Sequence, residues 1–146
     1  MLRARRLAVL RGTVLRASRL PPLPATSHER AGRRTGKRAE RRAAWHYRLR
    51  GYRILDANVW AGGNELDLVA RRGRHLVFVE VKSKSGEGHG DPLEMVTPEK
   101  QRGLLRAARA YLSARPELAG LDCAFDVVAV RGAALERVPG AFEPGW

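Results

Sequence analysis

Two apolar runs that carry acidic residues at alternate positions constrain the fold of this chain most. The first covers residues 62–70 and contains Glu65 and Asp67, and the second covers residues 76–82 and contains Glu80. Alternation with a period of two predicts β-strands. A carboxylate is rarely buried in a strand unless it is paired or bound to a metal. Glu80 stands among valines and therefore needs a stabilising partner, for which a divalent cation is the first candidate.

The two runs are joined by a hairpin signal. A tight turn at Arg72-Gly73 pairs Arg71 with Arg74 and places Asp67 opposite Phe78. The side chains that this register brings to one face are Glu65, Asp67, Glu80 and Lys82. A slip of one residue would send the acids to opposite faces. A solvated face with cross-strand pairs such as Glu65–Lys82 is the alternative that the pattern leaves open.

The remaining segments predict an α/β fold with a mixed central sheet of about five strands flanked by helices. The predicted elements are a helix over 37–50, strands over 52–60, 64–71 and 75–83, a mobile loop over 83–96, a helix from Thr97-Pro98-Glu99 to Ala114, and strands over 123–130 and 135–138. Their order is helix, three strands, helix, two strands. Gly51 supplies the stop signal of the first helix.

The 146 residues suit one domain with a basic extension. The net charge is +13, and residues 1–42 hold 13 Lys or Arg against 2 acidic residues. We expect a basic arm of low order over 1–34, a domain over 35–139 and an irregular tail over 140–146. A basic arm favours nucleic acid or anionic lipid as a partner. A solvated arm with no specific partner is the plainer alternative.

Other features limit the location of the protein. No apolar run approaches the roughly 20 residues of a membrane span, and the single Cys123 excludes an intramolecular disulfide. We expect a cytoplasmic protein. Residues 1–20 are rich in Arg and free of acids, so an organellar transit peptide is a second interpretation. The oligomeric state is open, a dimer included.

The acidic strands predict a hydrolytic site for phosphodiesters. Clustered carboxylates repel one another, and Mg²⁺ or Mn²⁺ would relieve that repulsion. A bound ion polarises phosphate and lowers the pKa of water, and a neighbouring lysine stabilises developing charge. Glu40 shares a helix face with Ala43, Ala44 and Tyr47. Glu40 lies on or beside the face that packs inward, and the helix pattern alone favours a carboxylate at the edge of this face that pairs with a neighbouring arginine.

Several polar and aromatic residues receive structural interpretations. The four histidines share no metal-ligand spacing, and Asp126 in an apolar strand is expected to be structural. Trp45 and Trp60 are expected in the core or at its rim rather than as platforms for bases.

A longer pattern resembles a known family. Its parts are Gly36 with Glu40, Gly51-Tyr52, residues 63–70, residues 77–82, Pro92-Leu93-Glu94, Val96-Thr97-Pro98 with Lys100-Gln101, and residues 125–130. The pattern is similar to the YraN family of bacterial proteins, in the resolvase-like branch of the PD-(D/E)XK, restriction-endonuclease-like superfamily. The resemblance implies a metal-binding Asp67, the catalytic acid and lysine Glu80 and Lys82, and a helical site acid Glu40. It also suggests Gln101 as a supporting residue. Leu66 stands where the superfamily's name has proline.

These observations predict a Mg²⁺- or Mn²⁺-dependent nuclease, with DNA favoured over RNA. The Val81 carbonyl is an additional candidate ligand, and Glu65 a supporting acid. The residues expected to contact phosphates are Arg33, Arg34, Lys37, Arg38, Lys84, Lys100 and Arg102. Two alternatives remain: a non-catalytic nucleic-acid-binding module on a nuclease fold, and a protein-interaction factor in a larger assembly.

Overall fold

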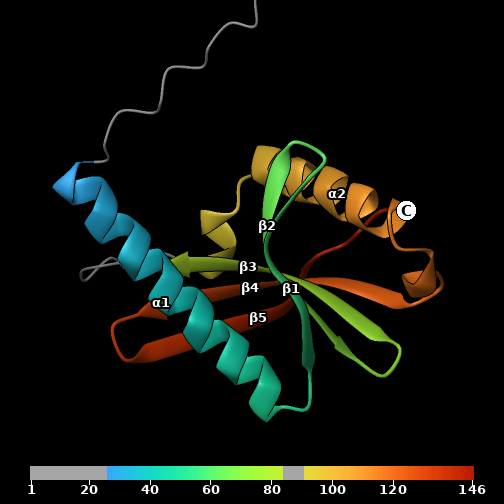
Figure 1. Ribbon diagram of the computed structural model, residues 1–146, viewed down its shortest axis with the longest axis horizontal. Helices are drawn as coiled ribbons and strands as arrows, with labels where there is room; N and C mark the ends of the chain where they lie inside the picture. The colour runs from blue at the N-terminus through green and yellow to red at the C-terminus, as the bar shows by residue number, and fades with distance from the viewer. Residues whose placement is uncertain (1–25, 84–90) are drawn as a thin grey trace, which may run out of the picture.

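The computed structural model describes residues 26–83 and 91–146 (Figure 1). Its elements are α1 (Ser27–Leu49), β1 (Arg53–Ala61), β2 (Asn64–Arg72), β3 (His75–Ser83), the 3-10 helix η1 (Pro92–Met95), α2 (Pro98–Ser113), the 3-10 helix η2 (Pro116–Leu118), β4 (Asp122–Arg131) and β5 (Ala134–Phe142). The predicted order of helices and strands is confirmed, and β3 has its predicted bounds.

The five strands form one mixed sheet in the order β1-β2-β3-β4-β5. β3 and β4 are parallel, and the other neighbouring pairs are antiparallel. A parallel pair needs a crossover connection, and α2 lies within it. α1 crosses one face of the sheet and α2 covers the other (Figure 1). The predicted α/β class with flanking helices is therefore confirmed.

Each face of the sheet has its own apolar core. Leu104 of α2 packs in one core with Phe78, whereas Ala43 of α1 packs in the other with Val77. β3 contributes to both cores because successive side chains of a strand point to opposite faces. The same alternation directs Glu80 toward the α2 side.

α1 is longer than its sequence pattern indicated. It begins at Ser27 rather than near residue 37, so residues 27–34 belong to the helix and not to the predicted arm. The pattern marked only the part that packs on the sheet, where Ala39 is the first buried residue, while the first turns project beyond it (Figure 1). The predicted end is confirmed, since Gly51 has a φ of 83°. The rest of the predicted arm, residues 1–25, lies outside the described residues.

β5 extends further than predicted, to Phe142. Pro139 and Gly140 had indicated a strand end. The Gly140 N–H instead donates a hydrogen bond to Asp126 Oδ1 at 3.0 Å, and Phe142 pairs with Phe125 after a register irregularity. Their rings stack with centroids 4.7 Å apart. The predicted tail from residue 140 is thus partly strand.

Asp126 is buried at the centre of a hydrogen-bond network, as a structural residue would be. Its Oδ2 accepts from the Tyr47 hydroxyl at 2.6 Å and from Arg137 Nε at 2.9 Å. The tryptophans were predicted in the core or at its rim, and neither lies in the core. Trp45 is 60% exposed and Trp60 is 72% exposed.

The N-terminus of α2 forms as predicted. The Lys100 N–H donates to Thr97 Oγ1 at 3.2 Å, and Pro98 is the first helical residue. Within the predicted loop, residues 84–90 lie outside the described residues, and η1 covers its second half. No helix among the described residues is long and apolar enough to cross a membrane.

Candidate active site

The turn between β2 and β3 sets which acids meet. The predicted register is wrong by two positions: Arg72 pairs with His75, and the turn residues are Gly73-Arg74. Gly73 has a φ of 59°, which a tight hairpin turn requires and other residues rarely adopt. Because the shift is even, Asp67 and Glu80 remain neighbours. Leu66 packs in the core on the α2 side and Leu68 in the core on the α1 side, so the alternation of β2 breaks at Asp67 and does not carry the predicted face on to Glu65. The register that pairs Leu68 with Val79 continues to place Asp67 beside Glu80 rather than opposite Phe78.

Strand pairing between β2 and β3 ends just before Asp67. The last paired residues are Leu68 and Val79. Beyond them, the Val81 N–H donates a hydrogen bond to Asp67 Oδ2 at 2.8 Å. The Asp67 carboxylate therefore occupies a place in the opening between the strands. The N–H and C=O of one residue in a strand point to the same side, so the Val81 carbonyl faces this opening as well.

Glu80 is buried with a carboxylate that is only half satisfied. The residue is 5% exposed. Its Oε1 lies 3.2 Å from Lys82 Nζ and 3.6 Å from Lys100 Nζ. Its Oε2 is buried without a hydrogen-bond partner among the described residues. Leaving a buried carboxylate oxygen unpaired costs free energy, and a cation next to Oε2 would remove that cost.

The acids of the site share one electrostatic environment. Burial, and after it the charge of Glu80, raises the pKa of Asp67 to about 7, against the lowering effect of the Val81 N–H. The charges of Glu40 and Glu65 raise it further. Asp67 therefore holds a proton near neutral pH when no cation is present. The charges that act on Asp67 agree with the predicted convergence of these acids, although Glu65 itself is exposed.

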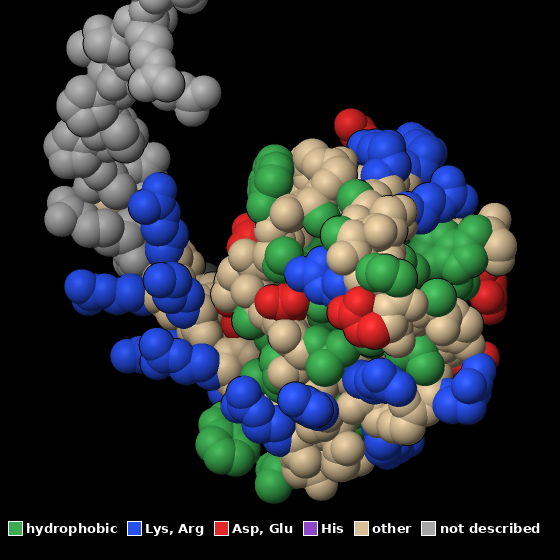
Figure 2. Space-filling model, turned by 45° about the vertical axis from the view of Figure 1, so that its right-hand side comes forward, with side chains coloured by type: hydrophobic (Ala, Val, Ile, Leu, Met, Phe, Trp, Pro, Cys, Tyr) green, Lys and Arg blue, Asp and Glu red, His purple; other side chains and the backbone are tan. Residues whose placement is uncertain are grey.

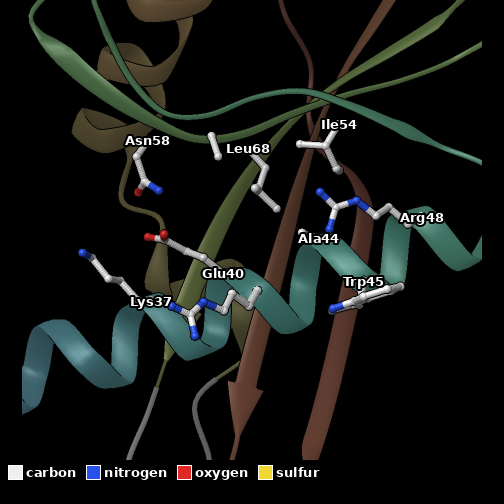
Figure 3. A pocket seen from close by; sticks show the side chains of 10 residues that line it. Lys37, Glu40, Ala44, Trp45, Arg48, Ile54, Asn58 and Leu68 are labelled. Atoms are coloured by element: carbon white, nitrogen blue, oxygen red, sulfur yellow. The ribbon is translucent and has the colours of Figure 1, made fainter.

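Glu40 reaches the acids from α1. Burial is the main cause that raises the pKa of its carboxyl, and the charges of Glu65 and Glu80 add to it. A hydrogen bond with the Asn58 side chain acts in the opposite direction, and Figure 3 shows the Glu40 carboxylate directed toward Asn58. Glu40 thus faces the sheet, and the charge of Lys37, one turn earlier on α1, also lowers the pKa of its carboxyl.

Asn58 is a site residue that sequence reasoning missed. Its φ is 52°, the left-handed conformation that asparagine tolerates better than most residues. The register of β1 and β2 shifts between Ile54 and Asp56. After that shift, the pairs on either side of Asn58 place it across from Asp67. The polar segment 56–58 in the middle of a predicted strand was the only available signal.

The residues present fit a hard divalent cation held by few protein ligands. Within residues 26–83 and 91–146, no three His, Cys, Asp or Glu side chains are close enough together to bind a metal. Mg²⁺ commonly takes only one or two carboxylates and completes its shell with water and phosphate oxygens. Asp67 with Glu80 Oε2 is such a set. A closed structural zinc site would need four ligands and does not fit.

Comparison with known proteins places this geometry in a family. The model of "Uncharacterised protein family UPF0102" matches residues 39–130. The chain belongs to UPF0102. A UPF0102 protein of Syntrophotalea carbinolica is 47% identical over 116 residues, which cover 76% of this chain and 94% of that protein. One from Geobacter sulfurreducens is 43% identical over 106 residues, which cover 69% and 81%. The predicted YraN family is thereby confirmed.

The UPF0102 match contains the whole acidic site. It begins one residue before Glu40 and ends on β4, so it includes Asp67, Glu80 and Lys82. Lys82 pairs with Glu80 rather than with Glu65, which differs from the cross-strand pair left open by the sequence. Figure 2 shows Lys and Arg side chains spread over the face in view, with acidic side chains scattered among them.

The remaining residues predicted for the site of this UPF0102 chain differ in where the structure places them. Gln101 Nε2 donates to the Val96 carbonyl at 3.2 Å at the start of α2, so its supporting role stays a prediction. Lys100 lies beside Glu80, which the sequence did not indicate. Lys84 is outside the described residues. The exposed basic residues predicted to contact phosphates are Arg33, Arg34, Lys37, Arg38 and Arg102.

Proposed function

We propose that the chain is a divalent-metal-dependent nuclease of the PD-(D/E)XK superfamily that hydrolyses phosphodiester bonds in DNA or RNA. The observation that carries the proposal is the pair Asp67 and Glu80. Two carboxylates are held together at a buried opening, one with an unpartnered oxygen and the other with its pKa raised to about 7. Lys82 Nζ lies 3.2 Å from Glu80 Oε1. A protein without a cation ligand has no evident use for this repulsion.

Each residue has a distinct role in this proposal. Asp67 and Glu80 hold the cation, Mg²⁺ or Mn²⁺, and the Val81 carbonyl adds a neutral oxygen. The bound ion supplies Lewis-acid polarisation of the phosphate and a more acidic water. Lys82 donates to the attacking water or to a phosphoryl oxygen that gains charge. Glu40, anchored by Asn58, orients water on the α1 side of the opening.

Cleavage of defined substrates tests the proposal. Single-stranded, duplex and branched DNA and RNA are incubated with the full chain and Mg²⁺ or Mn²⁺. Metal-dependent cleavage is expected, and Asp67→Asn or Lys82→Met should lower its rate at least about 100-fold. Asp122→Asn is the matched control, because Asp122 is an exposed residue of β4 whose register partner is His75, at the other end of β3. Absence of cleavage on every substrate, with intact binding, would reject the enzymatic proposal.

One observation favours a second candidate, a nucleic-acid-binding module without turnover. Lys82 and Lys100 both approach Glu80 Oε1, so much of its charge is balanced by the chain's own cations. The acids would repel the phosphates of a bound strand, so a module that only binds should not lose affinity when one of the acids is removed. If Asp67→Ala leaves binding unchanged or improves it, and no substrate is cleaved, this candidate replaces the nuclease.

A further inference from the structure

A cavity of about 360 Å³ lies between α1 and the β1–β2 part of the sheet (Figure 3). Glu40 and Asn58 line one end, and Trp45 and Arg48 line the other (Figure 3). Glu40 also belongs to the acidic site, because its carboxyl experiences the charge of Glu80. The cavity therefore opens next to the place where a phosphodiester would be cleaved.

The chemistry of the cavity suits a flat neutral ring that is linked to an anionic group. Trp45 is 60% exposed, and the Arg48 guanidinium carbon lies 5.6 Å from the centre of its indole ring, a cation–π distance. Ile54 and Leu68 supply apolar wall. The cations that line the cavity are Lys37, Arg41 and Arg48.

An exposed tryptophan among arginines is the arrangement that binds single-stranded nucleic acid. Bases stack on the aromatic ring while cations follow the phosphates. Asn58 and Glu40 at the far end offer polar groups to the edge of a base. A base inside a duplex is stacked between its neighbours and cannot enter the cavity without leaving the helix. The cavity would therefore distinguish unpaired from paired nucleic acid.

We propose that this cavity binds an unpaired base of the substrate strand and directs the acidic site to single-stranded or locally unpaired nucleic acid. The inference rests on the proposed function for its place in a reaction, but base binding itself requires no metal and no cleavage. It also replaces the expectation that Trp45 is a core or rim residue rather than a platform for bases.

The test is equilibrium binding of fluorescently labelled oligonucleotides to the full chain in EDTA. Single-stranded and duplex forms of the same sequence are compared by anisotropy. Trp45→Ala should weaken binding of the single strand about 10-fold and leave duplex binding within about twofold. Trp146→Ala is the matched control, because Trp146 is 51% exposed and has Arg109 at 5.4 Å from its ring, yet does not line the cavity. It should leave both affinities unchanged.

Competition with free nucleoside monophosphate separates a strand from a free nucleotide as the occupant. The proposal is supported if millimolar nucleotide displaces the oligonucleotide only weakly and Trp45→Ala acts on the single strand alone. It is overturned if Trp45→Ala and Trp146→Ala behave alike, if duplex affinity falls equally, or if the free nucleotide binds as tightly as the strand. Because binding is measured without metal, the binding result can be interpreted even if the protein proves not to be a nuclease.

Discussion

At the scale of single residues, Asp67 and Asp126 are two enclosed aspartates with opposite surroundings. Asp126 accepts hydrogen bonds from Tyr47, Arg137 and the Gly140 N–H. Within the part of the chain that the structure describes, Asp67 accepts a hydrogen bond from the Val81 N–H and faces other acids. The first carboxylate is stabilised by donors and holds elements together. The second is destabilised by its neighbours, which leaves it available to a cation or a proton.

Removal of the Tyr47 hydroxyl should expose the structural role of Asp126. Tyr47→Phe leaves a buried charge short of one donor, so we expect a loss of about 1–3 kcal/mol in the free energy of unfolding. Tyr111→Phe is the comparison, since its partner Asp56 is 36% exposed at the side chain and water can replace the hydroxyl. Urea denaturation measures both. An equal or smaller loss for Tyr47→Phe would contradict this account.

The metal-free protein should lose stability as the pH rises through the acidic and neutral range. Burial and Glu80 raise the pKa of Asp67 from 3.8 to about 7. Between these values the folded state binds a proton that the unfolded state has released. Stability therefore falls with increasing pH in this window and levels off above it.

Thermal unfolding in EDTA at pH 5 and pH 8 measures this effect. From pH 5 to pH 8 the melting temperature should fall more for the wild-type protein than for Asp67→Asn, because the asparagine has no proton to release. An identical pH dependence of the melting temperature in the two proteins would show that folding does not raise the pKa of Asp67.

At the scale of elements, the tip of the β1–β2 hairpin packs closely against α2. A side chain at Gly62 would place its Cβ 2.7 Å from the Arg106 carbonyl oxygen, and one at Gly103 would meet the Asn64 side chain at 2.7 Å. The backbones of hairpin and helix therefore touch directly. This contact holds β2, and with it Asp67, against the helix that carries Lys100.

Alanine variants of two neighbouring glycines distinguish the effect of this contact from the effect of backbone strain. Gly62 and Gly63 both have positive φ, but a Cβ at Gly63 meets nothing within 4 Å. Both alanine variants carry the strain of a left-handed residue, about 1 kcal/mol. Gly62→Ala should lose at least about 1 kcal/mol more, because backbone must move. Equal losses in urea denaturation would show that the hairpin and α2 are not in close contact.

The sequence could predict those parts of the fold that follow from local chemistry. Alternation defined β3 to the residue, and Thr97-Pro98 defined the start of α2. Asp67 and Glu80 are neighbours although the turn was misplaced, since a shift of two positions preserves the face. Asn58 and the contact of Lys100 with Glu80 could not be predicted, because each depends on how distant elements pack.

At the scale of the whole molecule, a strongly basic chain carries a small acidic site. The net charge is +13, most of it carried by residues 1–42, and α1 presents exposed Arg33, Arg34, Lys37 and Arg38 beside the cavity. Such a distribution attracts a polyanion while the acids repel it at the centre. A cation bound by Asp67 and Glu80 resolves that conflict, so the account depends above all on whether the cation binds.

Calorimetric titration of Mn²⁺ into the full chain at pH 8 tests that dependence most directly. At this pH Asp67 has released its proton, so metal does not compete with it. We expect one Mn²⁺ per chain for wild-type protein and for the Asp122→Asn control, and binding at least about 10-fold weaker for Asp67→Asn and Glu80→Gln. Equal binding by all four proteins, or no binding by the wild type at millimolar Mn²⁺, would contradict the account.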